Sequence, residues 1–381
     1  MVQTLSPIMV HILDLPIELL SHILSFIASP EDDEDVPSLV PSDTGDQSAK
    51  AKGTSPNKLK DKYRECDEDE DENLRNVCLV SRTFRDIAQP LLFRFFEDDS
   101  LDGDLSKTIS FAKTIYRRPD LGNHVQYVYI VPLSFGQSCP TSVDDPELFK
   151  SAIRDLQLGD QEETWIAAME KSDLSVWAAL LLNKTPNLRE LHLPGGQFSM
   201  KPFAHLFARN PSFLSKLECV WIDCDDEYSG YNIASYQEFL TLPKLINATF
   251  EYGDLVEESF PSTWTPGALA VEEIAFHQCH IDAGSVKKFM QACKKPKSFT
   301  YQNFTLDPRE RRTPSMRTEP EFNAAQVHEA ALLHKDTLEH FHVEFSRDPW
   351  DIDDLEKWLS SRIKFGSFRD FSKLDTIIVQ H

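Results

Sequence analysis

The stretch LRELHL at residues 188–193 has apolar residues at its first, fourth and sixth positions. The same spacing recurs in LECVWI at residues 217–222. Apolar residues that alternate at the end of such a unit are typical of a short strand with one buried face. A unit that recurs along the chain predicts a repeat protein, in which each copy buries its apolar residues against its neighbours.

Eight copies of this unit lie along the chain. They occupy residues 125–130, 188–193, 217–222, 245–250, 271–276, 296–301, 338–343 and 374–379. From residue 188 the first four spacings are 29, 28, 26 and 25 residues, in or near the range of leucine-rich repeats. Residues 173–188, DLSVWAALLLNKTPNL, read as a helix followed by a polar turn before the strand. The units therefore predict a parallel sheet with helices on its outer side.

These features resemble an irregular leucine-rich-repeat domain, which we place at residues 97–381. The resemblance implies an α/β fold, a solenoid with parallel strands inside and helices outside. The Asn or Cys that usually follows the strand is mostly missing: Cys279 fits that position, whereas Gly196 and Gly253 occupy it elsewhere. We expect Cys279 to be a small buried side chain at the turn.

Alternate residues of each strand should face away from the buried ones. These residues are Glu190, His192, Cys219, Trp221, Asp223, Asn247, Thr249, Glu251, Glu273, Ala275, His277, Ser298, Thr300, Gln302, His340, His342, Glu344, Thr376, Ile378 and Gln380. An exposed Trp beside His and acidic residues favours protein recognition. The candidate target-binding residues are His192, Trp221, Asp223, His277, His340 and His342. The alternative is that they are solvated strand residues beneath a C-terminal tail.

The segment LPIELLSHILSFI at residues 15–27 predicts an N-terminal helix. Pro16 suits the first turn, and Glu18 lies where a carboxylate favours the helix N-terminus. The apolar residues of this segment cover more than one face of the helix. A helix with two apolar faces must pack against two separate surfaces.

A polar stretch follows, and then a second helical region. Residues 30–72 contain 15 Asp or Glu and 6 Lys or Arg, so we expect a disordered acidic insert. Residues 74–96 follow with apolar residues that step by three and four, a helical stripe of Val77, Val80, Phe84, Ile87 and Leu91. Ser81 is expected to divide this region into two short helices as a break or N-cap, and Pro90 to end or kink the second.

Leu15-Pro16-x-Glu18-Leu19-Leu20 followed by the CLVSRTF stretch at residues 78–84 resembles an F-box, in the form common in fungal proteins. The acidic insert is a departure, because an F-box usually has no long interruption between its first two helices. The resemblance implies docking onto the Skp-type adaptor of a cullin–RING ubiquitin ligase. The adaptor-binding residues it implies are Leu15, Pro16, Glu18, Leu19, Leu20, Ile23, Leu24, Leu79, Val80 and Phe84.

Together the two resemblances imply the substrate-recognition subunit of an SCF-type ubiquitin ligase, with residues 1–96 for the adaptor and the repeats for an unknown protein substrate. Such a subunit performs no catalysis and needs no cofactor. The alternative is a repeat scaffold outside any ligase, whose N-terminal helices only cap the solenoid. Docking requires Leu15, Pro16, Leu19 and Ile23 to be exposed on the isolated chain, whereas capping requires them to be buried.

Composition and motifs argue against other classes. With 39 Lys or Arg against 62 Asp or Glu, the formal net charge is −23, which disfavours binding to nucleic acid or to anionic membranes. The hydrolase, phosphate-loop, dinucleotide-binding and zinc-protease motifs are missing. His277-x-Cys279-His280 supplies too few ligands to predict a zinc site. The seven cysteines and the missing export signal predict reduced thiols in the cytoplasm or nucleus.

Overall fold

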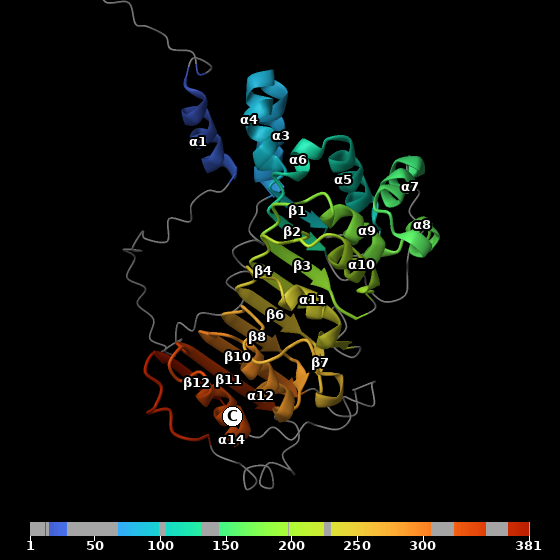
Figure 1. Cartoon of the computed structure of the whole chain (residues 1–381). Coiled ribbons are helices and arrows are strands. Elements are labelled where there is room, and N and C mark those ends of the chain that lie inside the picture. Colours follow the sequence, from blue (N-terminus) through green and yellow to red (C-terminus); the bar gives the residue numbers. More distant parts are fainter. Residues whose placement is uncertain are drawn as a thin grey trace, which may run out of the picture. The chain divides into compact units, whose positions relative to one another are not determined.

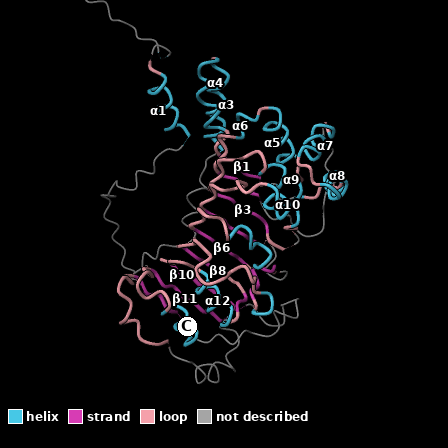
Figure 2. Tube along the Cα trace, in the orientation of Figure 1, coloured by secondary structure: helices cyan, strands magenta, loops and turns pink. Residues whose placement is uncertain are grey.

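A computed structural model describes residues 12, 15–28, 68–98, 104–130, 145–196, 198–224, 230–305, 324–347 and 365–380. The chain divides into two compact units, Met1–Phe95 and Phe96–His381. Each unit is described by itself below, and Figures 1 and 2 show their elements.

The described part of the first unit consists of three helices, α1 (Ile17–Ala28), α3 (Glu68–Val80) and α4 (Arg82–Leu92), which pack against one another. Their common core is formed by Leu20, Leu24, Leu74, Phe84, Ile87 and Ala88. Leu20 and Leu24 are one helical turn apart, so a single stripe of α1 supplies its share of this core. The two sequence segments thus meet, although residues 29–67, most of the expected acidic insert, lie outside the described residues.

Ser81 divides α3 from α4 as predicted. Its backbone is extended, and its hydroxyl oxygen accepts a hydrogen bond from the Phe84 N–H at 3.2 Å, which is an N-cap.

Two sequence expectations for the helical unit need correction. The helical stripe does not include Val80, whose side chain is 68% exposed. A new helix begins after Ser81, so the three-and-four spacing of α3 does not continue into α4. In addition α3 begins at Glu68, inside the stretch assigned to the insert; acidic residues favour a helix N-terminus, because that end of the helix dipole is positive. The helix α4 continues two residues past Pro90.

The described part of the second unit contains a nine-stranded, all-parallel sheet of order β1-β2-β3-β4-β6-β8-β10-β11-β12. The strands are β1 (Phe95–Asp98), β2 (Tyr127–Ile130), β3 (Glu190–Pro194), β4 (Cys219–Asp223), β6 (Asn247–Glu251), β8 (Glu273–His277), β10 (Ser298–Thr305), β11 (His340–Arg347) and β12 (Thr376–Gln380). Each of the eight repeat units from the sequence contains one strand, so the predicted α/β class is confirmed and the arrangement is leucine-rich-repeat-like. The edge strand β1 was not predicted, because it follows a helical pattern without a break signal.

The register stacks equivalent residues of successive repeats. Leu191 pairs with Val220, and the row continues through Ala248, Ile274, Phe299, Phe341 and Ile377. Parallel strands lie about 4.8 Å apart, so these side chains touch across the sheet. The rings of Phe299 and Phe341, for example, stack with centroids 5.9 Å apart. All members of the row except Ile377, on the edge strand, are buried.

Helices follow most strands and cover the apolar face of the sheet (Figure 1). They are α5 (Ser106–Arg117), α6 (Pro119–Gly122), α7 (Pro146–Asp155), α8 (Glu162–Glu170), α9 (Leu174–Leu182), α10 (Lys201–Arg209), α11 (Gln237–Leu240), α12 (Ala283–Ala292) and α14 (Ala324–Leu332). The predicted helix before β3 is α9, with Asp173 as N-cap and every residue buried. Ring contacts such as Phe276 to Phe289, at 5.3 Å, join the sheet to the helices.

A second, three-stranded parallel sheet was not predicted from the sequence. It consists of β5 (Tyr231–Asn232), β7 (Gly253–Leu255) and β9 (His280–Ile281), each of which follows a strand of the main sheet. Its strands are two or three residues long, too short to show a period in the sequence. Cys279 is buried at this turn as expected: its sulfur accepts a hydrogen bond from the Gly253 N–H at 3.4 Å.

We predict that Leu217→Ala destabilises the repeat unit by about 2–5 kcal/mol, because it leaves a cavity at a fully buried position. Denaturant unfolding followed by circular dichroism measures this change. Leu333→Ala is the matched control, since Leu333 is 47% exposed and its truncation should change stability by less than about 0.5 kcal/mol. Equal effects of the two substitutions would contradict the assigned core.

Candidate functional site

The helical unit exposes several large apolar side chains. On α1, Ile17, Leu19 and Ile23 are 57%, 49% and 41% exposed. At the end of α3, Leu79 and Val80 are 77% and 68% exposed. An isolated exposed apolar residue is ordinary, but five such residues on two short helices are typical of an interaction surface. We call Ile17, Leu19, Ile23, Leu79 and Val80 the exposed apolar set.

The predicted adaptor-binding residues divide into two groups. Leu20, Leu24 and Phe84 lie in the core of the helical unit, so their side chains stabilise the unit rather than face a partner. Leu15 packs partly against the same core, whereas Pro16, Glu18, Leu19, Ile23, Leu79 and Val80 are exposed. Ile17, which the sequence reasoning missed, belongs with the exposed group. Its position beside Pro16 at the start of α1 was the available signal.

The second candidate surface is the sheet face opposite the apolar row. We call it the polar face and define it by the central residues of its strands, Tyr129, His192, Trp221, Thr249, Ala275, Thr300, His342 and Ile378. The expectation that Trp221 is exposed was wrong. Trp221 is 7% exposed and His192 only 3%, because neighbouring strands bring large side chains into contact. Tyr129, His192 and Trp221 form a ring ladder, with centroid distances of 4.3 and 5.3 Å.

The six candidate target-binding residues do not form one cluster. His192 and Trp221 belong to the ladder, and Asp223 lies beside them with its carboxylate 3.9 Å from His192 Nε2. His277 is buried on β8. On β11, His340 is exposed and pairs with Asp375 at 3.2 Å, and the half-buried His342 lies 3.5 Å from Glu344. Burial lowers the pKa of His342, and Glu344 opposes that change. His340 is therefore the most accessible of the six.

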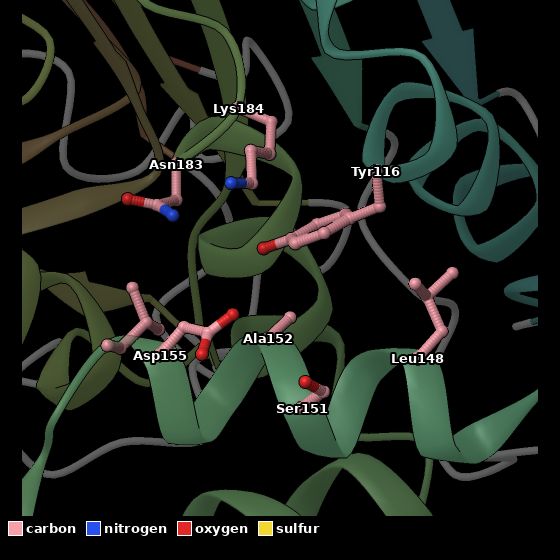
Figure 3. Close-up of a pocket in the computed structure, with 8 residues that line it drawn as sticks. Tyr116, Leu148, Ser151, Ala152, Asp155, Asn183 and Lys184 are labelled. Atoms are coloured by element: carbon pink, nitrogen blue, oxygen red, sulfur yellow. The ribbon is translucent and has the colours of Figure 1, made fainter.

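A cavity of about 290 Å³ lies between α5, α7 and the end of α9. Figure 3 shows the side chains of Tyr116, Asp155 and Lys184 directed toward it. The Tyr116 hydroxyl donates a hydrogen bond to the Leu180 carbonyl at 3.1 Å, and the Lys184 ammonium lies 5.0 Å from the centre of the Tyr116 ring. These contacts join helices, and the volume is just below the range of about 300–1,000 Å³ typical of ligand pockets. The cavity therefore does not favour a small-molecule site.

Within the residues that the structure describes, three or more His, Cys, Asp or Glu side chains do not gather in a way that could hold a metal ion. His277 and His280, which flank Cys279, lie on strands of two different sheets. Among the same residues, no helix has the length and apolar character needed to cross a membrane.

Asp254 and His280 form a largely buried pair in the second sheet, with Oδ1 and Nδ1 3.7 Å apart. Burial raises the pKa of Asp254 from 3.8 to about 6, and the charge of His280 opposes this rise. The folded state thus holds a proton on Asp254 more tightly than the unfolded state does. Stability therefore falls as the pH rises through the interval between these two values.

We predict that Asp254→Asn raises the free energy of unfolding at pH 7 by roughly 1–3 kcal/mol, because the amide avoids the cost of a buried carboxylate. The difference from wild type should shrink as the pH falls from about 6 to about 4 and be nearly gone below that. Thermal unfolding at several pH values measures it, with Asp370→Asn, at an exposed position, as the control. A variant that is less stable than wild type at pH 7 would show that the pair with His280 outweighs the burial of the carboxylate.

Comparison with known proteins identifies no relative: no family model matches the chain, and no curated protein matches it.

Proposed function

We propose that this chain is the substrate-recognition subunit of an SCF-type ubiquitin ligase. The helical unit binds the Skp-type adaptor, and the repeat unit binds the protein to be modified. In this role the chain is not itself a catalyst. It holds a target near the ubiquitin-carrying enzyme, and this proximity raises the rate of ubiquitin transfer.

The observation that carries this proposal is the exposed apolar set. In α1 the side chains of Leu20 and Leu24 are buried, whereas Leu19 and Ile23, one residue before each, are exposed. A helix with an apolar face left over after its own core has formed is suited to a second helical partner. The residues concerned lie in the two segments that resemble an F-box, which names that partner as the Skp-type adaptor.

The rival function, a scaffold whose N-terminal helices cap the repeats, requires the same side chains to be buried. Leu19 and Ile23 are about half exposed, at 49% and 41%, and Pro16 is exposed. Within the helical unit these side chains are left uncovered, and the experiment below distinguishes docking from capping.

The test is co-purification of the full chain with a Skp-type adaptor, with wild type beside Leu19→Ala/Ile23→Ala. We expect wild type to form a stoichiometric complex. The double variant should bind at least about tenfold more weakly, since central apolar anchors each contribute on the order of 1–2 kcal/mol to an interface. Fluorescence anisotropy with labelled adaptor gives the affinity.

Ile246→Ala/Leu333→Ala is the matched control, because it removes the same two side chains at exposed positions, 44% and 47%, of the repeat unit. It should bind the adaptor like wild type. Circular dichroism establishes that each variant is folded. A folded wild-type chain that does not bind the adaptor would refute the proposed function and leave the scaffold as the better account.

A further inference from the structure

The strand β12 lies at one edge of the main sheet. Within the described residues it pairs with β11 on one side and with no strand on the other. The side chain of Ile377 is 48% exposed, although the residues of the same row on the strands from β3 to β11 are buried. Ile377 is exposed because it lacks the neighbouring strand that covers the other members of its row.

The two edges of the sheet differ in their chemistry. The other edge strand, β1, ends in Glu97 and Asp98, and the buried Asp98 carboxylate accepts hydrogen bonds from the N–H and the hydroxyl of Thr108. Charged and inward-pointing residues on an edge strand oppose pairing with another chain. The sequence of β12, TIIVQ, has no charged residue, no Pro and no Gly, and three of its residues are β-branched and apolar. Thus β1 is protected against pairing, whereas β12 is open to it.

The hydrogen bonds of β12 show which of its backbone groups face the open edge. The Thr376 N–H donates to the carbonyl of Glu339, the residue before β11, at 3.2 Å. Backbone groups alternate in direction along a strand, so those of Ile378 also face β11. The N–H and C=O groups of Ile377 and Val379 therefore face outward, and a further strand has to pair with these two residues.

We propose that two copies of this chain associate through β12, with the two strands antiparallel and Ile378 of one copy opposite Ile378 of the other. Hydrogen-bonded and non-hydrogen-bonded pairs alternate in an antiparallel ladder. In this register the Ile378 pair is non-hydrogen-bonded, and Ile377 of each copy lies opposite Val379 of the other. Each outward N–H then meets an outward C=O. This inference goes beyond the proposed function and does not depend on it.

The sequence of β12 favours a second copy as the occupant of this edge. In both directions from Ile378 an apolar residue comes first and a polar residue second, so the strand is its own complement when it is antiparallel. Ile377 and Val379 are in register with the buried Phe341 and Val343, so the pairing covers the exposed side of Ile377 with an apolar residue. Because β1 is protected, the assembly stops at two copies related by a two-fold axis.

We expect a weak dimer, because a strand of five residues buries less area than a stable interface needs. Sedimentation equilibrium of the full chain in reducing buffer, from about 1 to about 100 µM, measures the association. Wild type should pass from monomer to dimer over this range. A folded wild-type chain that stays monomeric throughout would overturn the proposal.

Ile377→Lys tests the edge directly. It should weaken the dimer at least about tenfold, because the new charge would lie opposite an apolar residue of the other copy. Ile246→Lys is the matched control, since it makes the same substitution at a similar exposure, 44%, in the turn before β6. The control should associate within about twofold of wild type. An equal loss in the two variants would place the association elsewhere on the surface and overturn the assignment to β12.

Cross-linking tests the register. The Cα atoms of a non-hydrogen-bonded pair are about 4.5 Å apart, so two copies of Ile378→Cys can form a disulfide. In the same register the two Thr376 positions are offset by about 14 Å along the strands, which is too far. Under mild oxidation Ile378→Cys should give a dimer on a non-reducing gel, and Thr376→Cys no more dimer than wild type. Equal cross-linking of the two variants would refute the register.

Adaptor binding separates this proposal from the proposed function. Ile377→Lys should bind the Skp-type adaptor like wild type, since β12 belongs to the repeat unit. If wild type dimerises but does not bind the adaptor, the ligase function fails and the dimer stands. If Ile377→Lys is unfolded by circular dichroism, Val379→Pro replaces it. Pro removes an outward N–H that β11 does not use, and the same loss of dimer is expected.

Discussion

The structure of the repeat unit depends on the parallel register of neighbouring strands. With strands about 4.8 Å apart, each side chain touches the equivalent residue of the next repeat. On one face this stacks Phe250 on Phe276, with centroids 5.7 Å apart, and joins the sheet to the helices. On the other face it places His192 on Trp221 and aligns carboxylates from distant parts of the chain. A shift of one residue would exchange the two faces, so the apolar row fixes the polar one.

The helical unit depends on a smaller set of contacts. Its core is formed by a few side chains from three short helices, and cores of this size are marginal without further support. The Ser81 cap sets where α4 begins and so directs Phe84 and Ile87 inward. The cost of this break is that Leu79 and Val80, at the end of α3, are left exposed. Under the proposed function the adaptor completes the core that the chain leaves unfinished.

Much of the fold was accessible from the sequence, because its signals are local and periodic. The spacing in LRELHL located strands and faces in eight units, and Ser81 marked the start of a helix by its chemistry. Which side chains of the polar face are buried could not be predicted from the sequence. Trp221 occupies an outward position in its strand, but its exposure depends on Tyr129 and His192 in repeats far away in the sequence. The same holds for the helical unit. The sequence did not show that Leu20, Leu24 and Phe84 form its core. Nor did it show that Leu19 and Ile23 lie on its surface, because this depends on how the helices pack.

The order of strands in the main sheet follows the order of strands along the chain. Each strand therefore needs only the strand made before it, and none waits for a distant partner. A chain emerging from the ribosome can complete β2 and β3 as a pair while β11 and β12 are still unsynthesised. Repeat architectures of this kind nucleate locally and extend one unit at a time. The solenoid is thus suited to folding in the direction of its own synthesis, with each finished repeat serving as the template for the next.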